Sequence, residues 1–185
     1  MAGVSIELKA RCADLSHVRS ILQSRRAAFK GLDHQRDTYF CVPSGRLKLR
    51  EGNIENALIY YKRTDQKNSK RCASFLYRGP GGPALKKILA AALGVLAVVD
   101  KKREIYFIRH AKFHIDKVQR LGSFVEIEVF GPAGTLAEKK LREQCGFFQE
   151  LLGIEAKDLV ADSYSDQLLR LQSRKRKADK GWRMA

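Results

Sequence analysis

The sequence predicts an α+β fold: a closed eight-stranded antiparallel β-barrel with a charged lumen and helices packed outside. Three observations support this prediction. Segments in which apolar and polar residues alternate recur along the chain, and this is the period of a strand with one buried face. Tight turns join consecutive segments, which implies antiparallel pairing. Eight such strands with no obvious edge protection favour closure into a barrel.

The first strand is predicted at residues 4–11. Its alternate residues form one apolar and one polar set, namely Val4, Ile6, Leu8 and Ala10 against Ser5, Glu7, Lys9 and Arg11. A helix is expected over residues 14–23, because Asp14 can serve as its N-cap and the apolar residues that follow have helical spacing.

The other elements follow from the same patterns. Aromatic and β-branched residues or strict alternation predict strands at 34–42, 46–50, 57–64, 71–78, 97–109, 112–118 and 124–130. A loop at 79–83 precedes a helix at 84–93 that Gly94 closes. Thr135 is expected to cap a third helix through Glu150, with Glu138 at the capping-box position. A short element is expected at 163–171.

The length of 185 residues and a hydrophobic content of 44% suit one folded domain. We place this domain at residues 1–170 and expect residues 171–185 to be a basic, flexible tail. The four cysteines are far apart and form no C-x-x-C pair, so free thiols are expected. There is no signal peptide and no long apolar stretch, so we expect a cytoplasmic protein with no membrane partner. A homodimer is one assembly that the sequence allows.

The net charge of +16 calls for an anionic partner: a nucleic acid, an anionic membrane surface or a small polyanion. The distribution of charge narrows the choice. The tail at 171–185 carries +5 and the remainder of the chain +11. Most of the excess therefore belongs to the folded part.

Charged residues are concentrated on the polar faces of the predicted strands. They include Lys9, Lys48, Arg50, Arg63, Lys101, Arg103, His114, Asp116, Glu126 and Glu128. Such faces are most often solvated on the outside of a sheet. The helices, however, need an apolar sheet surface to rest on, and if they cover the outside, the polar faces must point inward. The cations would then bind a polyphosphate.

Glu126 and Glu128 lie at i and i+2 on one face of the last strand. Two carboxylates about 7 Å apart along a strand suit a hard divalent cation that keeps water and substrate oxygens as further ligands. His114 shares a face with Asp116 and is a candidate for a phosphate contact.

Several ordered motifs resemble the CYTH superfamily of triphosphate tunnel proteins, closest to its class IV adenylyl cyclase-like branch. They are Ser5-Ile-Glu7-Leu-Lys9, Gly45-Arg-Leu-Lys-Leu-Arg50, Leu58-Ile-Tyr-Tyr-Lys-Arg63, Val99-Asp-Lys-Lys-Arg103, Ile115-Asp116, Leu121-Gly-Ser-Phe-Val-Glu-Ile-Glu128 and Ser163-Tyr-Ser-Asp-Gln-Leu-Leu169. Together they span most of the predicted domain. The chain departs from the family pattern at Ser5, where the opening Glu-x-Glu-x-Lys motif has its first glutamate.

The resemblance implies an eight-stranded tunnel that binds a triphosphate with Mg²⁺ or Mn²⁺. Carried over by position, the metal would be held by Glu7, Glu126 and Glu128. The phosphates would be bound by Lys9, Lys48, Arg50, Arg63, Lys101 and Arg103. Lys9, Arg63 and Asp116 would serve catalysis, with Asp116 in the lumen orienting one of the basic residues. A hydroxyl at Ser5 cannot replace the charge of a carboxylate, but three acids remain for one metal site.

Three functions stay open at this stage. The first is a class IV adenylyl cyclase-like conversion of ATP to cyclic AMP and pyrophosphate. The second is hydrolysis of tripolyphosphate, thiamine triphosphate or a nucleoside triphosphate. The third is a non-catalytic module that binds a polyphosphate or nucleotide, which the serine at position 5 would explain. Nucleic-acid binding is expected only through the basic tail, since the chain lacks the interleaved aromatic residues of single-strand binders.

Overall fold

The computed structural model describes residues 3–63, 69–79, 82–132 and 134–181, and only the backbone of residues 3, 63, 73 and 175–181. Its strands are β1 (Gly3–Arg11), β2 (Ala28–Phe40), β3 (Arg46–Glu51), β4 (Ala57–Arg63), β5 (Lys70–Tyr77), β6 (Val95–Ile108), β7 (Ala111–Val118) and β8 (Gly122–Pro132). Its helices are α1 (Leu15–Ser24), α2 (Pro83–Leu93), α3 (Thr135–Leu151) and α4 (Tyr164–Gly181).

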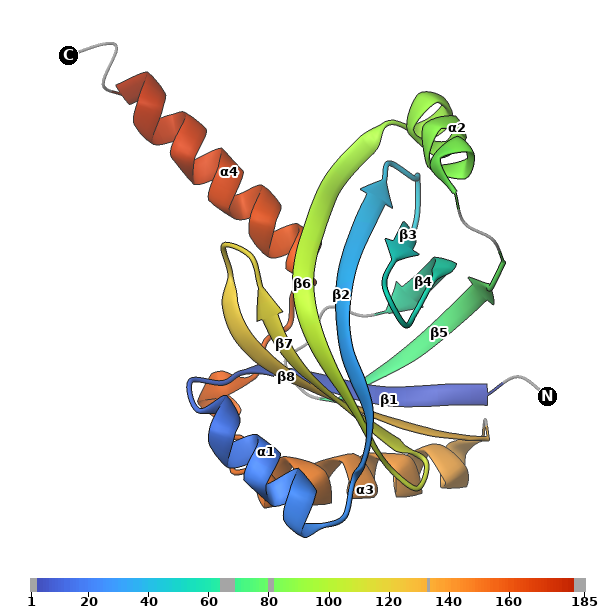
Figure 1. The fold of residues 1–185 in the computed structure, drawn as a ribbon, viewed down its shortest axis with the longest axis vertical. Helices are drawn as coiled ribbons and strands as arrows, with labels where there is room; N and C mark the ends of the chain where they lie inside the picture. Colours follow the sequence, from blue (N-terminus) through green and yellow to red (C-terminus); the bar gives the residue numbers. More distant parts are fainter. Residues whose placement is uncertain (1–2, 64–68, 80–81, 133, 182–185) are drawn as a thin grey trace.

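The strands form an antiparallel barrel (Figure 1). They pair in the order β1-β5-β4-β3-β2-β6-β7-β8, and β8 returns to β1 along the full length of β1. Among the described residues, each of these strands pairs with a neighbour on both sides, although β1 and β5 pair at only three positions. The predicted α+β class and the antiparallel barrel are confirmed.

Helices α1 and α3 cover the outer face of β1, β7 and β8, in the lower part of Figure 1. The apolar set of β1 packs there against α1 residues such as Leu22 and α3 residues such as Phe148. Asp14 caps α1 as predicted, since its side chain accepts hydrogen bonds from the backbone N–H groups of Ser16 and His17. Because the apolar face of β1 points outward, its polar face points into the barrel.

Helix α4 starts against the barrel and then projects away from it (Figure 1). Tyr164 and Leu168 are buried in a second apolar cluster that also contains Phe124. The helix was expected to end near residue 171, but it continues to Gly181. The polar sequence after Leu171 hid this extension, because it offers no apolar stripe to mark a packed helix. Residues 182–185 of the predicted tail lie outside the described residues.

Two helix predictions differ from the structure. Thr135 lies inside α3 rather than capping it; the N-cap is Gly134, and it makes no side-chain capping bond. Helix α2 was expected to pack on the barrel but buries none of its residues. In the part of the chain that the structure describes, no helix combines the length and the apolar character needed to cross a membrane.

Strand β2 begins earlier than predicted, at Ala28 instead of His34. Gly31 looks like a turn residue in the sequence. In the structure it has φ +138° and lies at a register shift between β2 and β6. A glycine tolerates this backbone, which residues with a Cβ rarely adopt, so the strand continues through the irregularity.

Candidate functional site

The interior of the barrel contains a cavity of about 550 Å³. Its charged lining residues are Glu7, Lys9, Lys30, Asp37, Lys48, Arg50, Glu55, Arg78, Lys101, Arg103, Lys112, Glu126 and Glu128. Among these described residues, eight are basic and five acidic, so the lining favours an anionic ligand. Another part of the lining is apolar and aromatic and includes Tyr39, Ile54, Ile59, Tyr61, Leu76 and Phe130.

Asp37 on β2 connects three of the cations. Its carboxylate lies 2.8 Å from Nε of Arg50, 3.0 Å from Nζ of Lys48 and 2.7 Å from Nζ of Lys101. Burial alone would raise the pKa of Asp37, but these three cations hold it well below its usual range. Asp37 therefore orients three cationic side chains, two from β3 and one from β6, toward one region of the cavity.

Lys101 is almost completely buried beside these groups. Burial lowers its pKa to about 7, and the nearby Arg50 and Arg103 act in the same direction, although Asp37 opposes them. Lys101 is therefore the cation of this group whose charge changes near neutral pH.

A second network surrounds Arg103 on β6. Its guanidinium bonds to both carboxylate oxygens of Asp116 and also lies 2.6 Å from Oε2 of Glu126. The hydroxyl of Tyr164, the first residue of α4, donates to Asp116 at 2.8 Å. Asp116 is 0% exposed, is the register partner of Arg103 on the neighbouring strand, and is not among the described residues that line the cavity. The sequence prediction has Asp116 in the lumen, orienting one of the basic residues. Its two hydrogen bonds with Arg103 are a contact of the kind that this role requires.

Lys9 on β1 extends toward the same end of the cavity. Its ammonium lies 3.0 Å from Oε1 of Glu126 and 3.7 Å from the centre of the Tyr164 ring. Glu126 is thus surrounded by the cations of Lys9 and Arg103, which hold its pKa well below the usual value against the effect of burial. Glu126 is already engaged in ion pairs.

Glu55 precedes β4 and links Arg50 to a further cation, Lys112. Its carboxylate lies 3.0 Å from Arg50 and 2.5 Å from Lys112. Burial would raise the pKa of Glu55, but Lys112 and Arg50 lower it. The buried carboxylate of Asp33 accepts from the backbone N–H groups of Ile54 and Glu55 and so fixes this loop.

Two carboxylates face each other across the β1–β8 ladder. Glu7 is the register partner of Glu128. Opposed residues of an antiparallel pair have Cβ atoms about 5 Å apart. Burial raises the pKa of Glu128 to about 7, and the charge of Glu7 adds to the effect, while a hydrogen bond from Ser5 opposes it. A divalent cation between Glu7 and Glu128 would remove this repulsion.

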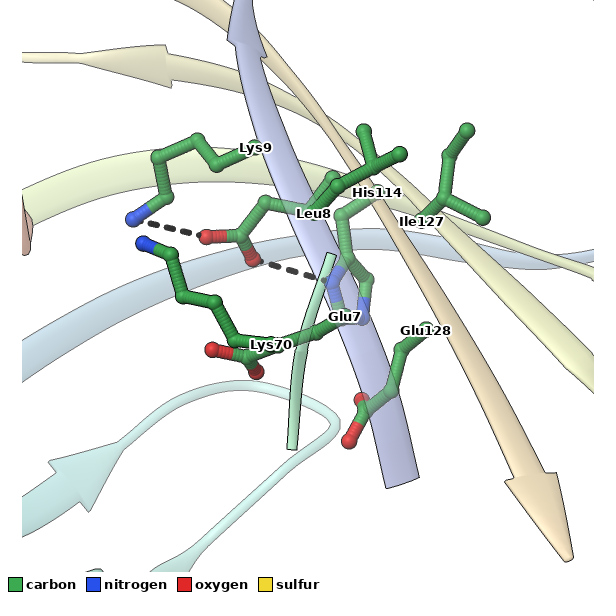
Figure 2. A pocket seen from close by; sticks show the side chains of 8 residues that line it. Glu7, Leu8, Lys9, Lys70, His114, Ile127 and Glu128 are labelled. Atoms are coloured by element: carbon green, nitrogen blue, oxygen red, sulfur yellow. Dashed lines mark hydrogen bonds and ion pairs between the residues drawn. The ribbon is translucent and has the colours of Figure 1, made fainter. Parts of the chain in front are cut away.

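A smaller cavity of about 20 Å³ adjoins this pair and is lined by Glu7, Lys9, His114, Glu126 and Glu128 among others (Figure 2). Its volume is enough for about one water molecule. Carboxylate oxygens are the ligand type that Mg²⁺ and Mn²⁺ take. Within the described residues, no three His, Cys, Asp or Glu side chains are already gathered in a metal-binding group. The chemistry of the two carboxylates, Glu7 and Glu128, nevertheless suits such an ion, which would need water or substrate oxygens as further ligands.

The barrel brings most of the predicted site residues to the cavity: Glu7, Lys9, Lys48, Arg50, Lys101, Arg103, Glu126 and Glu128. Asp116 is buried against Arg103 and is not among the described lining residues. Arg63 follows Ile59 and Tyr61 at two-residue steps along β4, and those two line the cavity; the side chain of Arg63 itself lies outside the described residues.

Sequence reasoning missed Asp37, Glu55, Lys112 and the role of Tyr164. Two of these left a signal. Asp37 alternates with Gln35 and Tyr39 on one face of β2, and Lys112 shares a face with His114. Glu55 lies outside any alternating segment, so its position depends on the folded loop.

Comparisons with known proteins agree with this geometry. The family model for the CYTH domain matches residues 4–164. The PH1012 protein from Pyrococcus horikoshii has a similar structure, with a TM-score of 0.72 and 25% identity over 88% of this chain and 98% of that chain. A comparison with curated proteins finds no match.

Two further structures share the fold at lower identity. A candidate adenylate cyclase from Vibrio parahaemolyticus has a TM-score of 0.72 at 17% identity, over 91% of this chain and 99% of that chain. A candidate adenylyl cyclase from Hippeastrum, described as having a dominant triphosphatase activity, has a TM-score of 0.57 at 9% identity, over 92% and 96%. With a family model that matches nearly the whole barrel, the chain belongs to the CYTH domain family.

Proposed function

We propose that this protein binds an organic triphosphate, together with a divalent cation, in the barrel cavity and turns it over. The observation that carries the proposal is the lining of the cavity, where rows of cations from different strands converge beside a pair of carboxylates. Arg and Lys bind phosphate oxygens by charge-assisted hydrogen bonds. The triphosphate binding expected from the sequence is thereby assigned, in this proposal, to one cavity.

The apolar part of the lining supports a substrate with an organic group. Tyr39, Tyr61 and Phe130 offer aromatic surface beside the cationic region. Bare tripolyphosphate would make no use of this surface, whereas the base of a nucleotide or the rings of thiamine triphosphate would pack against it. ATP is therefore the first substrate to test, followed by thiamine triphosphate.

The residues have separate tasks in this proposal. Lys9, Lys48, Arg50, Lys101 and Arg103 would bind the phosphate oxygens and stabilise the charge that develops in the transition state. Arg63 would join them from β4. Asp116 is a positioning residue because it acts through Arg103, as the geometry of their contact indicates.

Glu7 and Glu128 would hold Mg²⁺ or Mn²⁺. When bound, such an ion neutralises and polarises phosphate oxygens. Glu126 would act mainly through Lys9 and Arg103, with which it forms ion pairs. The hydrogen bond of Ser5 to Glu128 would keep this carboxylate oriented where the family motif has another glutamate.

Two reactions start from the same bound state. In an adenylyl cyclase-like reaction, the ribose 3′-oxygen of ATP forms a bond to the α-phosphorus, its proton passes to solvent, and pyrophosphate leaves. In hydrolysis, a water oxygen forms a bond to the terminal phosphorus, and the rest of the substrate leaves with the bridging oxygen. Both need the developing negative charge to be stabilised by the same cations.

The test is to incubate the protein with Mg²⁺ or Mn²⁺ and with ATP, thiamine triphosphate or tripolyphosphate, and to measure cyclic AMP, pyrophosphate and phosphate. Lys48→Gln should lower kcat/KM about tenfold or more, because a hydrogen bond between charged groups contributes about 1.5–3 kcal/mol. The matched control is Lys102→Gln, since Lys102 is exposed next to Lys101 and is not part of the cavity lining.

The outcomes separate the alternatives. Cyclic AMP with pyrophosphate identifies a cyclase, and phosphate identifies a hydrolase. Tight triphosphate binding without any product would identify the non-catalytic module that Ser5 suggests. If none of the three triphosphates binds at low salt, the proposal is wrong.

A further inference from the structure

His114 on β7 is a buried side chain that the proposed reaction leaves unused. It is 4% exposed and lines both the large cavity and the small one beside Glu7 and Glu128. No other histidine is among the described residues that line either cavity. Figure 2 shows it in the same pocket as Glu7, Lys9, Lys70 and Glu128.

The contacts of the ring identify which nitrogen carries the proton. Nδ1 lies 3.2 Å from Oε2 of Glu126, and the dashed line at the ring in Figure 2 marks this contact. An ionised carboxylate only accepts hydrogen bonds, so Nδ1 carries the hydrogen and donates it. Nε2 has no hydrogen-bond partner in the described structure although it is buried. A second proton on Nε2 would be a buried donor without an acceptor, so Nε2 presents a lone pair.

The charges around the ring also favour the neutral form of His114, in which Nε2 carries no proton. Burial and the nearby Arg103 lower the pKa of His114 to about 4, and Lys112 also disfavours a second positive charge. A neutral ring with a free lone pair at Nε2 cannot donate to a phosphate oxygen. The sequence-based suggestion that His114 contacts a phosphate therefore does not fit this arrangement.

A lone pair on a buried nitrogen is satisfied by a hydrogen-bond donor or by a metal ion. The two lysines that line the small cavity with His114 already have partners, because Lys9 pairs with Glu126 and Lys70 donates to the backbone carbonyls of Val160 and Ala161. The carboxylates of Glu7 and Glu128 line the same small cavity and are register partners across the β1–β8 ladder. A metal cation is a ligand that the carboxylate oxygens and the lone pair of Nε2 can bind together.

We propose that Nε2 of His114 is a nitrogen ligand of the divalent cation held by Glu7 and Glu128. It supplies the third protein ligand in a chain that has Ser5 in place of the first motif glutamate. The ring is held by Glu126, and Glu7 and Glu128 line the same small cavity from the consecutive neighbouring strands β1 and β8. The assignment rests on the metal site of the proposed function.

The proposal carries a metal preference. Mg²⁺ takes oxygen ligands and retains its water, whereas imidazole suits transition-metal ions. A mixed oxygen and nitrogen site should therefore favour Mn²⁺ over Mg²⁺. Histidine bound through Nε2, with Nδ1–H donating to a carboxylate, is also the arrangement in which an outer carboxylate strengthens a metal ligand.

The test uses the intact protein loaded with Mn²⁺ and electron spin-echo envelope modulation. We expect modulation from a directly bound ¹⁴N nucleus. In protein labelled with ¹⁵N only at histidine, this ¹⁴N modulation should be replaced by ¹⁵N modulation. Labelling distinguishes histidine from the lysine amines and requires no substitution, so folding is not at issue. Bound Mn²⁺ without nitrogen modulation, or modulation that histidine labelling leaves unchanged, would overturn the proposal, as would failure of Mn²⁺ to bind.

A variant identifies which histidine is involved. His114→Asn keeps an N–H near Glu126 and removes Nε2, so the nitrogen modulation should disappear. Mn²⁺ affinity, measured from the electron paramagnetic resonance signal of the free ion, should fall at least about tenfold. Loss of a residue that only supports a metal ligand already lowers affinity by about tenfold or more. His110→Asn is the matched control, since His110 is exposed and bonds to Gln144. Equal affinities of the two variants would contradict the assignment.

The two proposals fail in different ways. Turnover of a triphosphate by a protein whose Mn²⁺ lacks nitrogen modulation would disprove the role of His114 and leave the function intact. Nitrogen modulation in a protein that neither binds nor converts a triphosphate would establish the ligand and disprove the function.

Discussion

Glu7 on β1 lies directly opposite Glu128 on β8. Ser5, two residues before Glu7 on the same face of β1, donates a hydrogen bond to the carboxylate of Glu128. The motif position that differs from the family pattern is therefore part of the carboxylate pair rather than a distant surface site. The effect of the residue at position 5 on cation binding can therefore be measured separately from catalysis.

Ser5→Glu would add a third carboxylate to this pair. Without a divalent cation, the extra charge should destabilise the fold, by about 1.4 kcal/mol for each further unit by which the pKa of Glu128 rises. With Mn²⁺ the sign reverses, because a ligand that binds only the native state stabilises it. Thermal melts with a chelator and with Mn²⁺ would show a larger metal-induced rise in Tm for Ser5→Glu than for wild type.

Ser5→Gln is the matched control, because it has the same length without the charge. It should show no larger metal-induced rise in Tm than wild type. Equal rises for Ser5→Glu and Ser5→Gln would mean that position 5 has no access to the cation.

Asp37→Asn tests the network that orients the phosphate-binding cations. The substitution leaves Lys48, Arg50 and Lys101 without the carboxylate that compensates them. Removing one partner of a buried ion pair costs about 3–5 kcal/mol. Urea unfolding should show a loss of stability of this size, and added tripolyphosphate should restore part of it, since the anion supplies the missing negative charge.

Asp100→Asn is the control for this prediction. Asp100 pairs with His34 at the surface, where both side chains are at least one third exposed. Surface pairs contribute at most about 1 kcal/mol. A destabilisation by Asp37→Asn no larger than that of Asp100→Asn would show that the cations do not depend on Asp37.

Lys101 predicts how triphosphate binding depends on pH. Its pKa of about 7 in the free protein lies below the unperturbed value because of burial. A bound polyanion favours the charged ammonium and raises this pKa. Above about pH 7 binding therefore takes up a proton, and affinity falls as the pH rises from 7 toward 9. Calorimetry in two buffers with different ionisation enthalpies would measure the proton uptake.

The Lys101→Arg variant has a guanidinium that stays charged between pH 7 and 9. This variant should therefore bind the triphosphate with no proton uptake at position 101. Lys48→Arg makes the same change at another lysine that contacts Asp37 and should keep the uptake. Persistence of the full uptake in Lys101→Arg would assign it to a different group.

Alternation within strands was enough to predict the barrel and most of its charged lining. Lys48 and Arg50, for example, share a face because side chains repeat every two residues in a strand, and the structure places both in the cavity. The partners of these cations could not be predicted in the same way. The pairing of Asp37 with Lys101 depends on contacts between residues 64 positions apart, and that of Lys112 with Glu55 on the path of a loop.

The contacts at the end of the barrel near α4 also could not be predicted from the sequence. Local patterns indicated a short element from residue 163, but nothing in them places the ring of Tyr164 beneath Lys9 or its hydroxyl against Asp116. Such contacts between distant segments arise only when the barrel closes. They make Tyr164 the most informative position for separating the stability of the site from its affinity for a triphosphate.

Tyr164→Phe and Tyr164→Leu separate two contacts of one ring. Phenylalanine loses the hydrogen bond to Asp116, which should cost about 1.5–3 kcal/mol because the acceptor is charged. It keeps an aromatic face under Lys9, so tripolyphosphate affinity should stay within about twofold of wild type. Leucine loses the aromatic face as well, together with the edge contact to Phe124. Lys9 then loses one of the groups that orient it, and affinity should fall further. Urea unfolding and calorimetry of both variants would measure the two effects, and equal affinities for Phe and Leu would show that the ring does not position Lys9.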